Sequence, residues 1–126
     1  MPTRILIVED HDLFRRNLHS WLEGNFPTCT ISEAASGEEA LEIVRQTLPH
    51  IILMDITLPH MNGIATLRQI KAINTAPAVI MLTVHQESFY RTDALEAGAA
   101  AYVAKQEMYT HLLPILMPLI GNGASR

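Results

Sequence analysis

The stretch Ile5-Leu6-Ile7-Val8-Glu9-Asp10 is an apolar run that ends in two carboxylates. Three further short apolar runs end in polar residues in the same way: residues 51–54 before Asp55, 78–82 before Thr83 and 101–104 before Lys105. Runs of this length are typical of buried parallel strands. Parallel strands end at one edge of a sheet, where open α/β folds bind ligands. We therefore expect three acids, one hydroxyl and one ammonium to share a crevice.

Helical patterns alternate with these runs, as βαβ units require. Apolar spacing indicates helices over about residues 12–23, 37–47, 64–73 and 88–97, and a further strand over residues 29–35. Ser36, with Glu39 three residues later, forms a capping-box pattern before the second helix. Gly24-Asn25 and Gly98 are typical helix stops. The pattern predicts an α/β fold with a doubly wound, five-stranded parallel sheet.

The segment from Met108 to Ile120 departs from this pattern, because it is apolar nearly all round and contains Pro114 and Pro118. A proline inside a helix lacks its N–H and costs about 3 kcal/mol. We expect the segment to kink or to restart at Pro114 rather than to form a regular helix. We also expect it to leave apolar surface for a homodimer contact or for docking of another domain.

The length of 126 residues and the hydrophobic content of 48% suit one domain over residues 1–126. A net charge of −4 without a basic stripe argues against nucleic-acid binding by this domain itself. The single cysteine, Cys29, excludes an internal disulfide and suits a reducing compartment. No apolar run reaches the roughly 18 residues of a membrane span. We expect a cytoplasmic domain without membrane contact.

The clustered acids at the strand ends point to a metal. Carboxylates about 5 Å apart repel by roughly 3 kcal/mol per pair, so the cluster needs a cation. Oxygen ligands alone select a hard ion such as Mg²⁺. Lys105 can neutralise part of the charge and suits a phosphoryl oxygen. Asp55 ends a central strand with the other groups around it, and it is the natural nucleophile.

Two alternative functions are less well supported by the sequence. A phosphohydrolase of the haloacid-dehalogenase type also uses an aspartate after a strand, but it needs a second aspartate two positions later, where this chain has Thr57. A dinucleotide-binding turn needs G-x-G-x-x-G after the first strand, and residues 9–12 contain no glycine.

The combined motifs resemble the receiver (CheY-like) domain of two-component response regulators. The resemblance runs in unbroken order over about residues 4–107, with 108–120 as an atypical C-terminal region. It is carried by Val8-Glu9-Asp10-His11, Leu53-Met54-Asp55-Ile56, Pro59, Met61-Asn62-Gly63, Leu82-Thr83, Ala97-Gly98-Ala99 and Tyr102-Val103-Ala104-Lys105. The Glu-Asp-His opening is most similar to the subgroup whose outputs are helix-turn-helix DNA-binding domains.

This resemblance implies a (βα)₅ fold with sheet order 2-1-3-4-5. It implies a phosphoacceptor, rather than a classified enzyme, that takes a phosphoryl group from a histidine kinase or histidine phosphotransfer protein. The roles that it carries over are phosphorylation of Asp55, Mg²⁺ ligation by Asp10, Asp55 and the Thr57 carbonyl, an indirect metal contact for Glu9, phosphoryl contacts for Thr83 and Lys105, and a rotamer switch at Tyr102.

Three departures from the family pattern bear on this reading. Gln106 stands where many receivers have a proline, and His60 stands where a glycine is common. The third departure is the final segment, since Leu112–Ile120 has no charged residue. These departures leave an alternative function open, that of a receiver-shaped interaction module that no longer signals by phosphorylation.

Overall fold

The computed structural model describes residues 2–84 and 88–121. Strands and helices alternate along the chain, and the last helix follows a short 3₁₀ turn, η1. The elements are β1 (Arg4–Val8), α1 (Asp12–Asn25), β2 (Thr30–Ala34), α2 (Gly37–Gln46), β3 (Ile51–Asp55), α3 (Gly63–Ile73), β4 (Ala78–Thr83), α4 (Ser88–Glu96), β5 (Ala101–Ala104), η1 (Lys105–Glu107) and α5 (Met108–Ile120).

The five strands form one parallel sheet in the order β2-β1-β3-β4-β5, as expected. Strand β3 lies at the centre and is buried at every residue. Asp55 pairs with Leu82 across the β3–β4 ladder, and Thr83 pairs with Ala104 across the β4–β5 ladder. The register therefore brings Asp55, Thr83 and the start of η1 to the same edge of the sheet.

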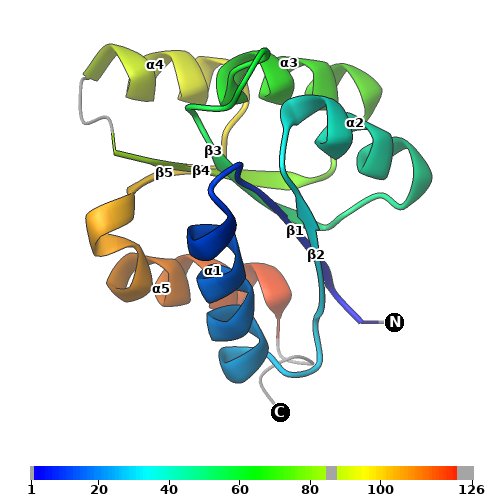
Figure 1. The fold of residues 1–126 in the computed structure, drawn as a ribbon, viewed down its shortest axis with the longest axis vertical. Helices are drawn as coiled ribbons and strands as arrows, with labels where there is room; N and C mark the ends of the chain where they lie inside the picture. Colours follow the sequence, from blue (N-terminus) through cyan, green and yellow to red (C-terminus); the bar gives the residue numbers. More distant parts are fainter. Residues whose placement is uncertain (1, 85–87, 122–126) are drawn as a thin grey trace.

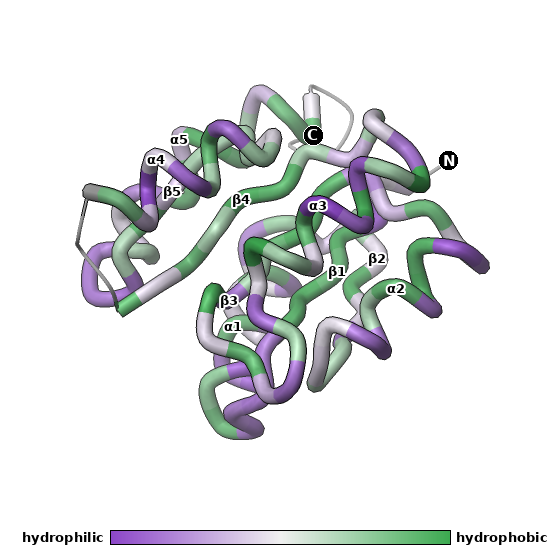
Figure 2. The backbone as a smooth tube through the Cα atoms, turned by 90° about the horizontal axis from the view of Figure 1, so that it is seen from above, coloured by the Kyte–Doolittle hydropathy of each residue, from purple (hydrophilic) through white to green (hydrophobic). Residues whose placement is uncertain are grey.

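Helices cover both faces of the sheet, with α1 and α5 on one face and α2, α3 and α4 on the other (Figure 1). Alternate strand residues enter separate apolar clusters, so that Ile5 and Ile7 pack with α1 and α5, while Leu6 and Val8 pack with α2 and α3. Strands β1 and β4 are mostly apolar along their length, whereas the helices alternate apolar and polar residues (Figure 2). This burial on both faces explains the near-continuous apolar strands.

Several predicted boundaries shift by one or two residues. Helix α1 runs on through Gly24 to Asn25, because Phe26 is buried at 3% exposure and its N–H donates to the Leu22 carbonyl at 2.7 Å. Strand β2 is shorter than residues 29–35, because its ladder with β1 runs only from Thr30 to Ala34. The Ser36 cap is confirmed, since its hydroxyl accepts from the Glu39 N–H at 3.1 Å.

The expected restart of the final helix at Pro114 was wrong, because α5 is one helix that contains both prolines. Met108, Leu112, Leu116 and Ile120 recur every four residues and are buried against the sheet. Pro114 and Pro118 both lie on the exposed side. The carbonyls that lose a partner therefore face water, which can satisfy them, and side-chain packing outweighs the proline cost.

Candidate functional site

Asp55 is the last residue of β3, and a tightly folded loop holds it in place. The side chain is nearly buried, and its Oδ1 accepts from the Thr57 N–H at 3.2 Å. The Gly63 N–H donates to the Ile56 carbonyl at 2.7 Å and closes the loop. Asn62 caps α3 through its side-chain oxygen, which accepts from the Ala65 N–H at 2.9 Å. The orientation of the Asp55 carboxylate is therefore fixed by backbone groups on its own loop.

Lys105 is the first residue of η1, directly after β5, and its ammonium lies beside the Asp55 carboxylate. Its Nζ lies 2.6 Å from Glu9 Oε1 and 3.3 Å from Asp55 Oδ2. The second oxygen of Glu9, Oε2, accepts from the His11 N–H at 3.0 Å. Lys105 thus joins two carboxylates that follow different strands, and the predicted convergence of these residues is confirmed.

Burial raises the pKa of the Glu9 carboxyl above its usual value, and the charge of Asp55 adds to this effect. The hydrogen bonds from Lys105 and from the His11 N–H act in the opposite direction. Glu9 is 2% exposed, so its ionised form is tolerated only because both oxygens are hydrogen-bonded.

Glu9, Asp10 and Asp55 each offer one oxygen within 4.8 Å of the others. Six oxygens around Mg²⁺ at about 2.1 Å lie about 3 to 4 Å apart, so small side-chain adjustments suffice for this set. Lys105 balances only one of the three carboxylate charges. Asp10 is exposed, whereas both Glu9 oxygens already accept hydrogen bonds, so Asp10 is more available to an ion than Glu9 is. The residues fit the expected ion.

An open pocket of about 570 Å³ covers these groups. Its lining combines the acids and Lys105 with apolar side chains at the rim, and consists of Glu9, Asp10, His11, Phe14, Asp55, Thr57, Val84, Lys105 and Gln106. Phe14 lies within the helix predicted over residues 12–23, and the apolar spacing of that helix does not reveal its second role at the pocket.

Thr83 and Tyr102 lie on neighbouring strands behind the pocket. Thr83 is fully buried at the end of β4 and is not among the lining residues of the pocket, so the expectation that its hydroxyl shares this crevice with the acids and Lys105 was wrong. Tyr102 is half-buried on β5, opposite Met81, and packs against the cluster beneath α2, α3 and α4. The structure therefore places both side chains near the sheet edge without showing their proposed roles.

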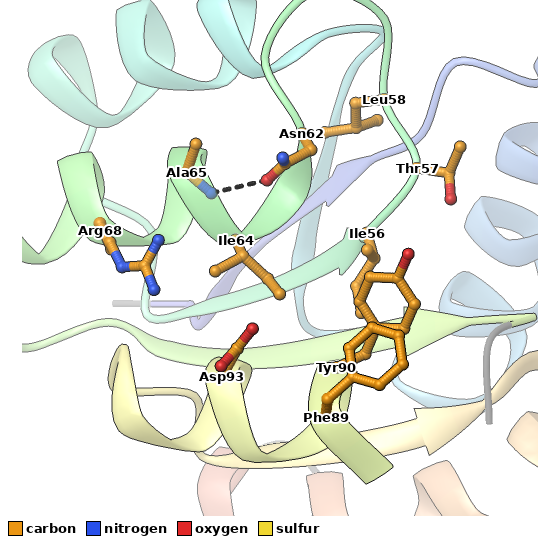
Figure 3. A pocket seen from close by; sticks show the side chains of 10 residues that line it. All are labelled: Ile56, Thr57, Leu58, Asn62, Ile64, Ala65, Arg68, Phe89, Tyr90 and Asp93. Atoms are coloured by element: carbon orange, nitrogen blue, oxygen red, sulfur yellow. Dashed lines mark hydrogen bonds between the residues drawn. The ribbon is translucent and has the colours of Figure 1, made fainter. Parts of the chain in front are cut away.

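A second pocket, of about 420 Å³, lies between α3 and α4 on the other side of the Asp55 loop (Figure 3). Phe89 and Tyr90 of α4 form one wall, and Arg68 of α3 faces Asp93 of α4. Thr57 lines both pockets, so the loop that holds Asp55 is also a wall of this one. No pattern in the sequence predicted this pocket.

Two of the departures from the family pattern, His60 and Gln106, have different structural outcomes. His60 is exposed and has a φ of 66°, a left-handed conformation that favours glycine, and it does not line the Asp55 pocket. The peptide bond between Lys105 and Gln106 is trans, as are all peptide bonds of the described residues. His60 is thus explained as a loop residue in a strained conformation.

A charged network that was not predicted ties α1 to β2. Glu33 Oε1 accepts from Arg15 Nε at 2.6 Å, and Glu33 Oε2 lies 2.6 Å from His19 Nδ1. Arg15 also donates to the Glu9 carbonyl at 2.8 Å, next to the acidic cluster.

None of the described helices is both long and apolar enough to cross a membrane.

Comparison with known proteins places this geometry in context. A family model for the response regulator receiver domain matches residues 5–116. The response regulator GacA of Pseudomonas protegens is 34% identical over 102 residues, which cover 81% of this chain and 48% of that protein. A protein-glutamate methylesterase/protein-glutamine glutaminase of Idiomarina loihiensis is 38% identical over 107 residues, which cover 84% of this chain and 28% of that protein. The chain thus spans about half or less of these relatives.

Solved structures agree with the fold. A two-component response regulator of the LuxR family from Aurantimonas superposes with a TM-score of 0.87 and 32% identity, covering 95% of this chain and 86% of the other. A receiver domain protein (CheY-like) from Methanospirillum hungatei superposes with a TM-score of 0.82 and 26% identity, covering 94% and 97%.

Proposed function

The chain belongs to the response regulator receiver domain family, and from this premise we propose that Asp55 is its phosphoacceptor. The carrying observation is that the Asp55 carboxylate opens into a pocket with two further acids and the Lys105 ammonium. The phosphoryl group brings further negative charge, which the Lys105 ammonium and a cation held by the acids would offset.

The proposed reaction starts from a phosphohistidine on a histidine kinase or a histidine phosphotransfer protein. An Asp55 oxygen attacks phosphorus, the phosphorus–nitrogen bond breaks, and the histidine nitrogen keeps the electron pair and takes up a proton. Asp10, Asp55 and the Thr57 carbonyl would hold Mg²⁺, which offsets charge on the transferring group when bound. The chain serves here as an acceptor and not as a turnover enzyme.

The proposed output is a change at the β4–β5 edge. Thr83 and Lys105 would hydrogen-bond the phosphoryl group, and Tyr102 would change rotamer in response. Such a switch requires contacts that differ between two states. Thr83→Ala should therefore leave Asp55 able to accept phosphate while reducing the NMR shift changes of Tyr102. Equal shift changes in both proteins would exclude this coupling.

We further propose that residues 1–126 are one receiver domain of a response regulator with a DNA-binding output. The similarity to relatives named as transcriptional regulatory proteins, such as DegU of Brevibacillus brevis, supports this output. A cytoplasmic location suits the free thiol of Cys29. Helix α5 exposes Met117 at 50% and Leu119 at 43%, and this apolar face is proposed to form a homodimer contact.

The central experiment is labelling by acetyl phosphate with and without Mg²⁺. Wild type should be labelled only with the ion, and Asp55→Asn should not be labelled, because it keeps the shape but lacks the ionised nucleophile. Asp12→Asn is the matched control, since Asp12 lies outside the acidic cluster. Persistent labelling of Asp55→Asn would move the acceptor to another residue, and an unlabelled wild type would favour the receiver-shaped interaction module.

A further inference from the structure

The Lys105 ammonium is enclosed on three sides. Two sides are the carboxylates of Glu9, at 2.6 Å, and Asp55, at 3.3 Å. The third is the face of the Phe14 ring, whose centroid lies 4.3 Å from Nζ. The Lys105 side chain is only 15% exposed, so little water reaches the ammonium. The ring face carries partial negative charge and attracts a cation most strongly where water is scarce.

The position of the Phe14 ring is set by structure on both sides of it. Phe14 lies in the first turn of α1, and its N–H donates to His11 Nδ1 at 3.2 Å, which caps the helix. The side chain packs against the apolar cluster between the sheet and α1 and α5, and it also lines the Asp55 pocket. The ring is thus anchored to the core while its face meets the ammonium.

We propose that Phe14 is a positioning residue that holds the Lys105 ammonium, through its ring face, where it can donate to a phosphoryl group on Asp55. This inference rests on the proposed phosphoacceptor function. Without the ring, the flexible four-carbon stem of Lys105 leaves the ammonium to the two carboxylates and to water. An aliphatic side chain fills the same space but offers no negative face.

The alternative role of Phe14 is simple core packing. In that case Phe14→Leu lowers stability but leaves the place of the ammonium unchanged. Phe14→Tyr keeps the ring and should behave as wild type. Trp21→Leu is the matched control, because Trp21 packs on the same cluster from the same helix but makes no contact with Lys105.

Two measurements separate these roles. The first is the NMR shift of the Lys105 side chain in protein without added ions, where the Phe14 ring should shift its protons upfield. The chain has only one other lysine, Lys71, which serves as an internal reference. Phe14→Leu should abolish the upfield shift, and Trp21→Leu and Phe14→Tyr should keep it.

The second measurement is the affinity for beryllofluoride with Mg²⁺, as a mimic of the phosphoryl group on Asp55. Phe14→Leu should bind about two- to tenfold more weakly than wild type, as for a partly desolvated cation–π contact. If Phe14→Leu binds beryllofluoride as tightly as wild type does, or keeps the wild-type shift of Lys105, the positioning role of Phe14 is overturned but the phosphoacceptor function is not. A folded wild type that takes up no beryllofluoride would overturn the phosphoacceptor function and this inference with it.

Discussion

Gly63 lies so close to the backbone of Asp55 that a Cβ on it would overlap the Asp55 carbonyl oxygen and come within 2.9 Å of the Ile56 Cα. Both obstacles are backbone atoms, which cannot turn aside as a side chain would. The glycine that begins α3 is therefore required by the end of β3, and the loop between them has little freedom.

Gly63→Ala should destabilise the fold by about 1 to 3 kcal/mol, because relief of the overlap moves the backbone that orients Asp55. Labelling at Asp55 should fall with it. Gly24→Ala is the matched control, since its Cβ meets nothing within 4 Å and it lies in the last turn of α1. That variant should gain about 0.5 to 1 kcal/mol. Urea unfolding measures the free energy of unfolding of both variants. Equal changes in the two would show that the backbone near Asp55 accommodates the added Cβ without loss of stability.

Mg²⁺ should raise the melting temperature of the wild type, because the proposed site, the acidic cluster, exists in the folded chain only. At ten times the dissociation constant, the expected gain is about 1.4 kcal/mol. Asp10→Asn should lose most of this gain, whereas Asp12→Asn, which leaves the cluster of Glu9, Asp10 and Asp55 intact, should keep it. Differential scanning calorimetry with and without the ion decides, and an equal gain in all three proteins would place the ion elsewhere.

The Glu33 network should make stability depend on pH. Burial works to raise the pKa of the Glu33 carboxyl, but hydrogen bonds from Arg15 and His19 outweigh it and hold the pKa below the ordinary value of 4.5. The stabilisation is therefore present above pH 4.5 and lost as the pH falls through the folded-state pKa.

Glu33→Gln should cost about 1 kcal/mol at pH 7 and much less in acid, because the wild type then loses the same charge. Urea unfolding at the two pH values gives the difference. Glu42→Gln, at an exposed position of α2, is the control and should show neither effect. A constant difference at all pH values would mean that the charge of Glu33 contributes nothing.

The left-handed backbone conformation of His60 should lower the stability of the folded state. A residue with a Cβ in the left-handed region loses about 1 to 2 kcal/mol, and His60 has a φ of 66°. His60→Gly should therefore be more stable than His60→Ala by about 1 kcal/mol. If the two variants unfold at the same urea concentration, the loop relaxes to another conformation in solution.

The exposed face of α5 should support self-association. Met117→Glu with Leu119→Glu should shift the sedimentation of a concentrated sample from dimer to monomer without loss of helix content. Ile73→Glu is the control, because Ile73 is similarly exposed, at 40%, on the opposite side of the sheet. A wild type that stays monomeric at high concentration would end the dimer proposal.

The polar residues at the strand ends could be predicted from the sequence, because each of them directly follows a short apolar run. Apolar runs with a polar last residue placed Asp55 and Lys105 at one edge, and the contacts of Lys105 with Glu9 and Asp55 confirm this. The continuity of α5 was not predictable, since a local proline cost says nothing of four buried side chains on the opposite side of the helix. The contact of Phe14 with Lys105 joins residues far apart in sequence, and no local pattern encodes it.

The parallel sheet divides the buried apolar residues that the structure describes into two compartments with no member in common. The apolar residues under the Asp55 loop, Ile56, Leu58 and Ile64, belong to one compartment, and the buried residues of α5 belong to the other. Substitutions in different compartments should combine additively, because they share no neighbours. The face that carries α5 can therefore diverge during evolution without compensating changes beneath the loop.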